Sequence, residues 1–224
     1  SKWSFNSSMS KIFVDTIEPK TTGGSITFPE SSTFSGTSTF NGTSNFTGTV
    51  TGASPTVIVS SGNAGSAVSN LEIDLPTDAS YHKFELSIHD IYNSGDTDLA
   101  VAFRTSGGSY ATNYTYSTME RTYGASPNGA SGNSGSGNAQ IGYYNLGNAL
   151  IEANSYNITI TNNKTASYHT KYFYTAYGLA SNAYATIRVG GGSVNVAEIN
   201  DRLKLYPLSG TMTHGEWVLY GWKK

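Results

Sequence analysis

In residues 32–52 every apolar side chain and every glycine stands at an even-numbered position. Phenylalanine recurs every six residues, at Phe34, Phe40 and Phe46, and a glycine follows each one two residues later. The odd-numbered positions of the segment are all Thr, Ser or Asn. Six residues of helix would scatter the phenylalanines around the helix axis, whereas in an extended strand an even spacing puts them on one face. The pattern therefore predicts a strand with one apolar and one polar face.

A single strand of this kind cannot bury its own phenylalanines. Three parallel copies wound about a common axis would bury them, with Phe34, Phe40 and Phe46 at the trimer axis and the glycines giving room for close approach. We therefore expect a trimeric fibrous β shaft. A flexible Ser/Thr/Gly linker would not keep Phe, Gly and Thr in phase over three periods, and three or four hexads supply barely one coil of a single-chain β-helix.

Beyond residue 55 the chain consists of short apolar runs separated by turn residues. Apart from a weak helical period at 197–203, no window of ten or more residues keeps a helical pattern. This texture predicts an all-β fold, an antiparallel β-sandwich of jelly-roll-like form, with Trp217 and Leu219 in its core or at a subunit interface. The runs expected to form strands are 56–59, 71–75, 84–88, 99–103, 157–160, 172–177, 185–189, 203–206 and 217–220.

Four regions follow from this pattern. We expect residues 1–8 to be a remnant of cloning, because Met9-Ser-Lys has the form of a natural start. Residues 9–30 would form an N-terminal attachment segment, residues 31–54 the shaft, and residues 55–224 a globular head large enough for its own core.

The composition narrows the range of partners. Charged residues make up 12% of the 224 residues, about half the usual share, and the net charge is −2. No Lys/Arg cluster is present, so we expect no nucleic-acid partner. The chain has no cysteine, which excludes disulfides and thiolate metal sites. No stretch approaches the 18 or so apolar residues of a membrane helix, so we expect no membrane insertion.

Tyrosines concentrate around a Gly/Ser/Asn-rich stretch at 125–139, which we expect to be a long loop. Tyrosine suits the recognition of sugars and proteins because a rigid apolar ring carries a hydrogen-bonding tip. The alternative is that these rings pack in the core or in the trimer interface, above all Tyr114 and Tyr116, which share one face of a strand. The candidate ligand-binding residues are Tyr110, Tyr114, Tyr116, Tyr123, Asn128, Tyr143 and Tyr144.

The chain offers little catalytic or metal-binding chemistry. None of its four histidines is paired at metal-ligand spacing, and Asp96 and Asp98 fit a turn better than a calcium loop. There is no Gly-x-Ser-x-Gly elbow, and Gly190–Gly192 follows a strand without opening a helix, so it is not a phosphate cradle. We expect no catalytic residues, no metal and no cofactor.

The order of these regions resembles the short tail fibres and receptor-binding proteins of tailed bacteriophages. The resemblance rests on the start at residues 9–19 (MSKIFVDTIEP), the Phe-x-Gly-Thr shaft and a β-rich head. It extends to Ile187–Val189, Leu205–Gly210 and the ending Trp217–Gly221. The His-x-His pairs that hold axial metal ions in some fibres are missing from the sequence, and so is a recognisable autocleaved chaperone domain.

The resemblance implies a homotrimer of the virion. Its N-terminal segment would dock to a phage tail or baseplate protein, and its head would bind a surface glycan or protein of the host without catalysis. Two other classes stay open: a fibre-borne polysaccharide depolymerase, which needs two carboxylates placed across a sugar, and a purely structural decoration or spacer protein.

Overall fold

The computed structural model describes residues 56–65, 67–123, 129–141, 149–179 and 185–223. The chain divides into two units, residues 1–51 and 52–224, and all described residues belong to the second, the C-terminal unit. Phe34, Phe40 and Phe46 lie outside the described residues, so the trimeric shaft stays a prediction. The described part contains strands and one short 3₁₀ helix, η1 (Leu150–Glu152), which confirms the all-β prediction. No helix in it is long and apolar enough to cross a membrane.

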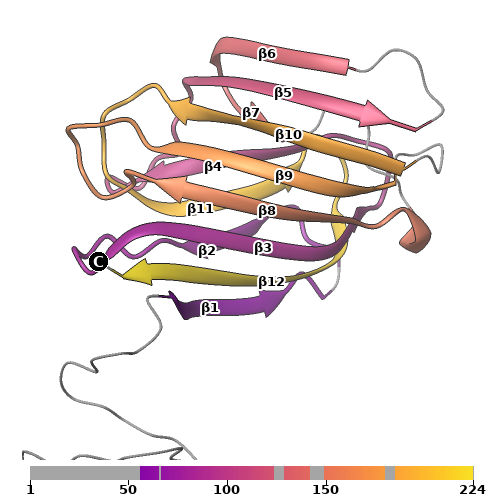
Figure 1. Cartoon of the computed structure of the whole chain (residues 1–224), viewed down its shortest axis with the longest axis horizontal. Coiled ribbons are helices and arrows are strands. Elements are labelled where there is room, and N and C mark those ends of the chain that lie inside the picture. The colour runs from indigo at the N-terminus through magenta and orange to yellow at the C-terminus, as the bar shows by residue number, and fades with distance from the viewer. Residues whose placement is uncertain (1–55, 66, 124–128, 142–148, 180–184, 224) are drawn as a thin grey trace, which may run out of the picture. The chain divides into compact units, whose positions relative to one another are not determined.

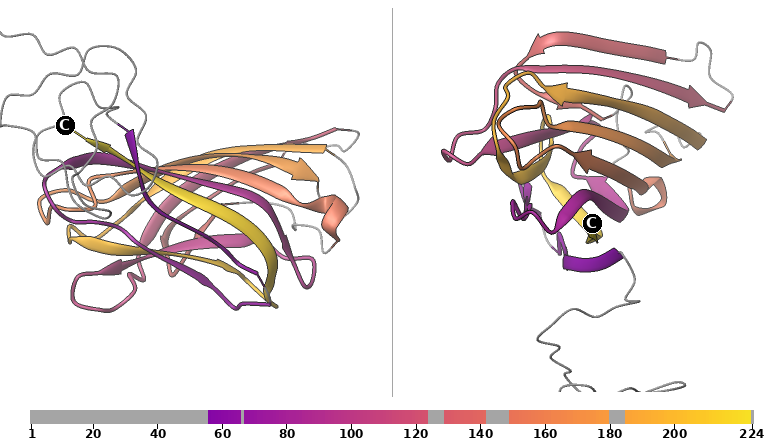
Figure 2. Two further views of the ribbon diagram at one scale, coloured as in Figure 1. Left: turned by 90° about the horizontal axis from the view of Figure 1, so that it is seen from below. Right: turned by 60° about the vertical axis from the view of Figure 1, so that its left-hand side comes forward.

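The strands form two antiparallel sheets that lie as separate layers (Figure 1; Figure 2). The larger sheet has eight strands, in the order β1 (Thr56–Asn63), β12 (Met212–Lys223), β3 (Tyr81–Asn93), β8 (Asn154–Thr161), β9 (Lys171–Leu179), β10 (Ala185–Val194), β5 (Tyr114–Thr122) and β6 (Gly129–Ser136). The smaller sheet has four strands, in the order β2 (Leu71–Asp74), β11 (Asn200–Pro207), β4 (Leu99–Thr105) and β7 (Ala139–Gln140).

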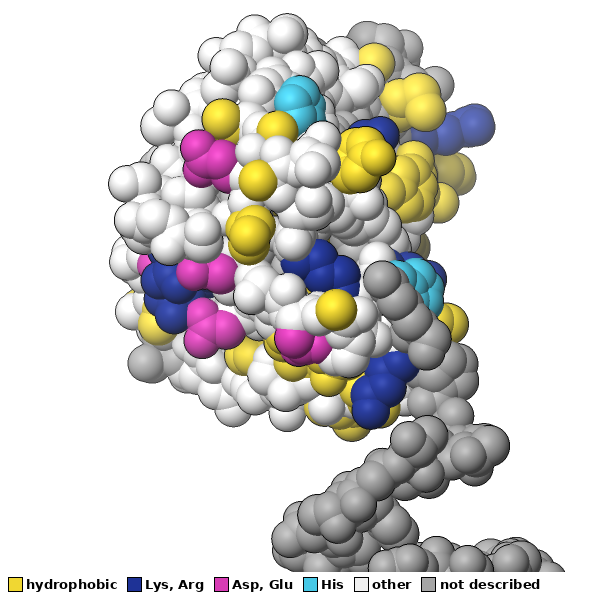
Figure 3. Space-filling model, turned by 90° about the vertical axis from the view of Figure 1, so that its left-hand side faces the viewer, with side chains coloured by type: hydrophobic (Ala, Val, Ile, Leu, Met, Phe, Trp, Pro, Cys, Tyr) yellow, Lys and Arg dark blue, Asp and Glu magenta, His cyan; other side chains and the backbone are white. Residues whose placement is uncertain are grey.

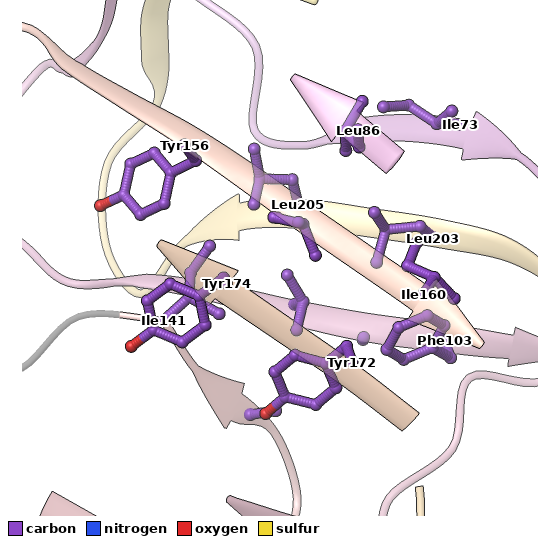
Figure 4. Packing of buried hydrophobic residues seen from close by; sticks show 14 of the residues in the cluster. Ile73, Leu86, Phe103, Ile141, Tyr156, Ile160, Tyr172, Tyr174, Leu203 and Leu205 are labelled. Carbon is purple, nitrogen blue, oxygen red and sulfur yellow. The ribbon is translucent and has the colours of Figure 1, made fainter. Parts of the chain in front are cut away.

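Alternating side chains from both sheets meet in one apolar core (Figure 4). On β8, Tyr156, Ile158 and Ile160 are buried, while the residues between them face outward. Rings and aliphatic side chains on the inner side of the smaller sheet pack against the larger sheet. Phe103 on β4, for example, makes a tilted contact with Tyr172 on β9, at 5.9 Å between ring centroids. This period of two is what fixes the register, because a one-residue slip would turn each apolar set outward.

Strand β12 lies between β1 and β3 in the larger sheet. Leu219 is fully buried, and Trp217 is half-buried against the core cluster, which confirms the expectation for both residues. Because β12 pairs with a strand on each side, it connects β1 to the rest of the larger sheet.

The expectation of one long loop at 125–139 is wrong, because this Gly/Ser/Asn-rich stretch contains strand β6, which pairs with β5. The weak helical period at 197–203 overlaps β11, whose inward Leu203 and Leu205 pack in the core. The run Gly190–Gly192 lies within β10, where the ring of Tyr174 and the backbone of the neighbouring strands leave no room for a Cβ.

Candidate functional site

The strands of the larger sheet run between two ends of the C-terminal unit. Thr56, Trp222 and Lys83 lie in register at one end. At the opposite end, which we call the distal end, Tyr123 donates its backbone N–H to the carbonyl of Ala185 at 2.9 Å. The distal end is therefore the part of the unit farthest along the strands from the residue where the described chain begins.

Three large apolar side chains are exposed at the distal end. Tyr123 is 81% exposed, Ile151 on η1 is 77% exposed, and Leu208 in the turn before β12 is 41% exposed. The described residues that flank 124–128, 142–148 and 180–184 also lie at this end. The predicted site residues Asn128, Tyr143 and Tyr144 belong to these segments and lie outside the described residues.

Two of the predicted ligand-binding tyrosines lie in the core and cannot contact a ligand on the surface. Tyr114 is fully buried, its hydroxyl oxygen accepts the N–H of Phe103 at 2.9 Å, and burial raises its pKa to about 12. Tyr116 is buried as well and donates its hydroxyl to Gln140 Oε1 at 3.2 Å. Both side chains point inward from β5, which corresponds to the core alternative left open for this pair.

The third, Tyr110, lies apart from the distal end, on the outer face of the smaller sheet. It is half-buried, and the ammonium of Lys204 lies 4.0 Å from its ring centroid. Burial, followed by hydrogen bonding to Glu72, raises the pKa of Tyr110 to about 12. The structure therefore brings only Tyr123 of the described candidates to the distal end.

A buried ion pair lies between the sheets in the distal half of the unit. Arg188 on β10 and Glu120 on β5 are both fully buried, with Arg188 Nε 2.6 Å from Glu120 Oε2. Arg188 Nη1 also donates to Asn154 Oδ1 at 2.8 Å. Burial disfavours the guanidinium charge, but Tyr156 and Glu120 outweigh it and raise the pKa of Arg188 above its ordinary value. A salt-bridged pair enclosed in this way has an interior structural role.

Asp98, in the turn before β4, lies near this pair, and its carboxyl group is in an unfavourable environment. Its Oδ1 atom is buried and has no hydrogen-bond partner among the described residues. Burial raises the pKa of Asp98, and Arg188 partly opposes that shift. The expectation that Asp98 merely shapes a turn therefore misses a carboxyl group that the fold holds in an unfavourable place.

We expect Asp98→Asn to stabilise the protein at pH 7 by on the order of 1 kcal/mol, because it removes a poorly solvated charge. Since the folded pKa is raised above the unfolded value near 3.8, the charge destabilises the fold as pH rises from there through the folded pKa. Thermal unfolding midpoints measured from pH 3.5 to 7 should separate with rising pH. Asp96→Asn, at an exposed position two residues away, is the control and should show no such trend.

A second exposed apolar group lies on the outer face of the larger sheet. Of the nine large apolar side chains that are exposed in the described part of the chain, four come from the adjacent strands β5, β10 and β9. We call this group the apolar patch: Met119, Phe173, Tyr177 and Ile187, each between 52% and 63% exposed. Register places Ile187 beside Tyr177, and the half-buried Val189 beside Met119.

Sequence reasoning missed the apolar patch, although a signal for it exists. Residues 172–177 (YFYTAY) carry rings on both faces of the strand, with Tyr172 and Tyr174 inward and Phe173 and Tyr177 outward. A strand that is apolar on both faces is typical of one covered on both sides.

Polar side chains line a hollow of about 280 Å³ on the same outer face, over β12, β3 and β8. Its lining contains one carboxylate, Glu85, which pairs with Lys83 at 3.0 Å, and glycoside hydrolysis by two carboxylates needs a second. The lining residues are Glu85, Ser87, Asn157, Ile158, Thr159 and Tyr220.

A larger hollow of about 410 Å³ lies at the end opposite the distal one, lined by Thr77, Ala79, His82, Asn162, Lys164 and Thr165. The Lys164 ammonium donates to the carbonyl of Asp78 at 3.1 Å. No group of three or more His, Asp or Glu side chains in the described ranges could hold a metal ion.

Comparisons with protein-family models, with curated proteins and with solved structures found no match to this chain.

Proposed function

We propose that the chain is a non-enzymatic attachment protein, the receptor-binding fibre subunit of a tailed bacteriophage. In this proposal it is a homotrimer in the virion, with residues 9–30 docked to a tail or baseplate protein. The hexad repeat forms the shaft, the C-terminal unit is the jelly-roll-like head, and the distal end of the head binds a host surface glycan or protein.

The observation that carries this proposal is the exposure of Tyr123 at the distal end. A tyrosine that is 81% exposed buries little of its ring in the fold, and its ring and hydroxyl suit contact with a sugar or a protein. Thr56, through which the head continues toward the shaft segment, lies at the other end of the strands. A shaft that holds the head from that end would leave the distal end free to meet a cell surface, and three copies would multiply weak contacts.

The proposal predicts that Tyr123→Ala/Tyr143→Ala/Tyr144→Ala in the full chain abolishes attachment to cells. Labelled protein would be tested on a panel of bacterial cells and on arrayed purified surface polysaccharides, which separates glycan from protein receptors. Tyr168→Ala is the matched control, since Tyr168 is 64% exposed but lies in the turn between β8 and β9, at the other end. Attachment should change little with salt, because few charges are available to be screened.

Normal attachment by a folded, trimeric triple variant would place the receptor site elsewhere. Release of new reducing ends from a bound polysaccharide would instead make the protein a depolymerase. Failure of the unmodified chain to bind any cell or glycan of the panel would count for a structural spacer.

A further inference from the structure

The outer faces of the two sheets differ in chemistry. The smaller sheet presents ion pairs to solvent, with Arg202 Nε 2.6 Å from Asp74 Oδ1 and Arg202 Nη1 2.7 Å from Glu72 Oε2. The larger sheet presents the apolar patch and, over β3, the ion pair Lys83–Glu85. In Figure 3 the acidic side chains lie at the left and lower centre, while hydrophobic side chains gather at the upper right, with basic side chains beside them. The larger sheet therefore carries the face that gains from being covered.

A second apolar group lies at the other margin of that same face. Ile58 on β1 is 65% exposed, and Val218, Tyr220 and Trp222 face outward from β12 and are half-buried. We call this group the β1/β12 margin. The outward residues of β3 and β8 that line the polar hollow lie between it and the apolar patch, and Tyr220 borders that hollow. One sheet face thus has two apolar margins with a polar strip between them.

We propose that three copies of the chain pack through this face, with the apolar patch of one head against the β1/β12 margin of the next. This inference rests on the three-chain association of the proposed function. A cyclic trimer uses heterologous contacts, in which two different surfaces of each copy meet, and two separate apolar margins are what such a contact requires.

The short connection from the shaft segment restricts the arrangement. Four residue steps separate Gly52 from Thr56, so in the proposed trimer Thr56 of each copy would lie within roughly 14 Å of Gly52 of the same copy. Strands β1 and β5 are six strand positions apart, roughly 29 Å, so one face cannot lie wholly at the axis. Three such faces would enclose the axis like the sides of a triangular prism, and neighbouring sides of a prism meet at their margins.

The apolar patch is smaller than a standard interface, but it is large enough for copies that a shaft already holds together. Four side chains of this size, each more than half exposed, present roughly 400–500 Å² of mostly apolar surface. A standard interface between free proteins buries about 800 Å² on each partner. Heads joined by a shaft have a high effective concentration, so a smaller contact is enough to hold them together.

Strand register predicts which residues of neighbouring copies would be in contact. A closed trimer is generated by rotation alone, which keeps each residue at its own height along the axis. With the strands running along that axis, residues of one transverse row meet residues of the same row in the next copy. One row crosses the whole sheet: Ser61, Val218, Ser87, Asn157, Thr175, Val189, Met119 and Ala130. Ser61 and Thr175 are exposed residues of this row, one in each margin region.

Cysteine cross-linking tests this arrangement, because the natural sequence has no cysteine. The full chain carrying Ser61→Cys and Thr175→Cys would be treated with a short bis-maleimide and separated under denaturing conditions. The expected product is a covalent trimer, since residue 61 of each copy is joined to residue 175 of the next. A chain with one cysteine can be joined to only one neighbour, so either single variant should stop at dimers.

Ser61→Cys with Ser209→Cys is the matched control. Ser209 is exposed in the turn between β11 and β12, away from the larger sheet's outer face, and this pair should give no covalent trimer. A trimer by sedimentation that yields no covalent trimer from Ser61→Cys/Thr175→Cys, or yields as much from the control pair, overturns the proposed packing and leaves the proposed function standing. A monomer by sedimentation overturns both.

Discussion

Glu120→Ala should cost about 3–5 kcal/mol of folding free energy, because it removes the carboxylate that neutralises a fully buried guanidinium. In a unit of this size, a loss of that order lowers the thermal unfolding midpoint by roughly 10 °C. Circular dichroism melting of the full chain would measure the shift. Glu120 lies on β5 and Arg188 on the neighbouring β10, so the loss should appear as loosening of the distal half of the larger sheet.

Two controls separate the buried charge from a general effect of mutation. Asp201→Ala breaks the partly exposed pair with Arg104 at 2.8 Å and should shift the midpoint far less, because solvated pairs contribute little. Glu120→Leu/Arg188→Met removes both charges and should recover much of the stability lost in Glu120→Ala. If the double variant melts as low as the single one, the pair is not the source of the effect.

Phe40→Asp should convert the trimer to monomers. In the proposed shaft, three carboxylates would be brought together in an apolar axis, and each would need to be desolvated without a partner, at several kcal/mol per charge. Sedimentation velocity of the full chain would measure the change. Thr39→Asp is the matched control, because an odd-numbered position faces solvent in the predicted strand and should keep the trimer.

Either of two results would contradict the shaft. An unmodified chain that sediments as a monomer would remove the need for partners at Phe34, Phe40 and Phe46. Equal loss of the trimer in Phe40→Asp and Thr39→Asp would show that the segment does not have one buried and one solvent-exposed face.

Alternation predicted most of the strands of the C-terminal unit but not β5, β6 and the two-residue β7. Each predicted run overlaps a strand, because Leu, Ile, Val and Phe mark the inward positions there. On β5 the inward positions after Tyr116 are Thr118 and Glu120, which line the polar interior around Arg188. A strand whose buried side is polar has no alternation of apolar and polar residues to detect. The glycine and serine residues of β6 show no such alternation either.

The candidate site was less predictable than the fold. Tyr114, Tyr116 and Tyr123 have similar sequence surroundings, yet the first two are core residues and the third is exposed. Parity puts Tyr114 and Tyr116 on one face of a strand, but it does not say which face is buried until the pairing of β5 with β10 and β6 is known. The apolar patch was missed for a related reason: it spans three strands that adjoin only through sheet pairing, with β5 and β9 on either side of β10.

The position of β12 has a consequence for biosynthesis. Strand β1 is connected to β3 in the larger sheet only through β12, and β12 is the last strand of the described chain to leave the ribosome. About 120 residues of nascent chain, from the end of β3 to the start of β12, must be made before that connection. The unit therefore closes late, through contacts of long sequence separation, which form slowly. Local pairs such as β8–β9 and β9–β10 can form earlier, so an interrupted chain would expose the apolar inner side of a half-built sheet, a form prone to aggregation.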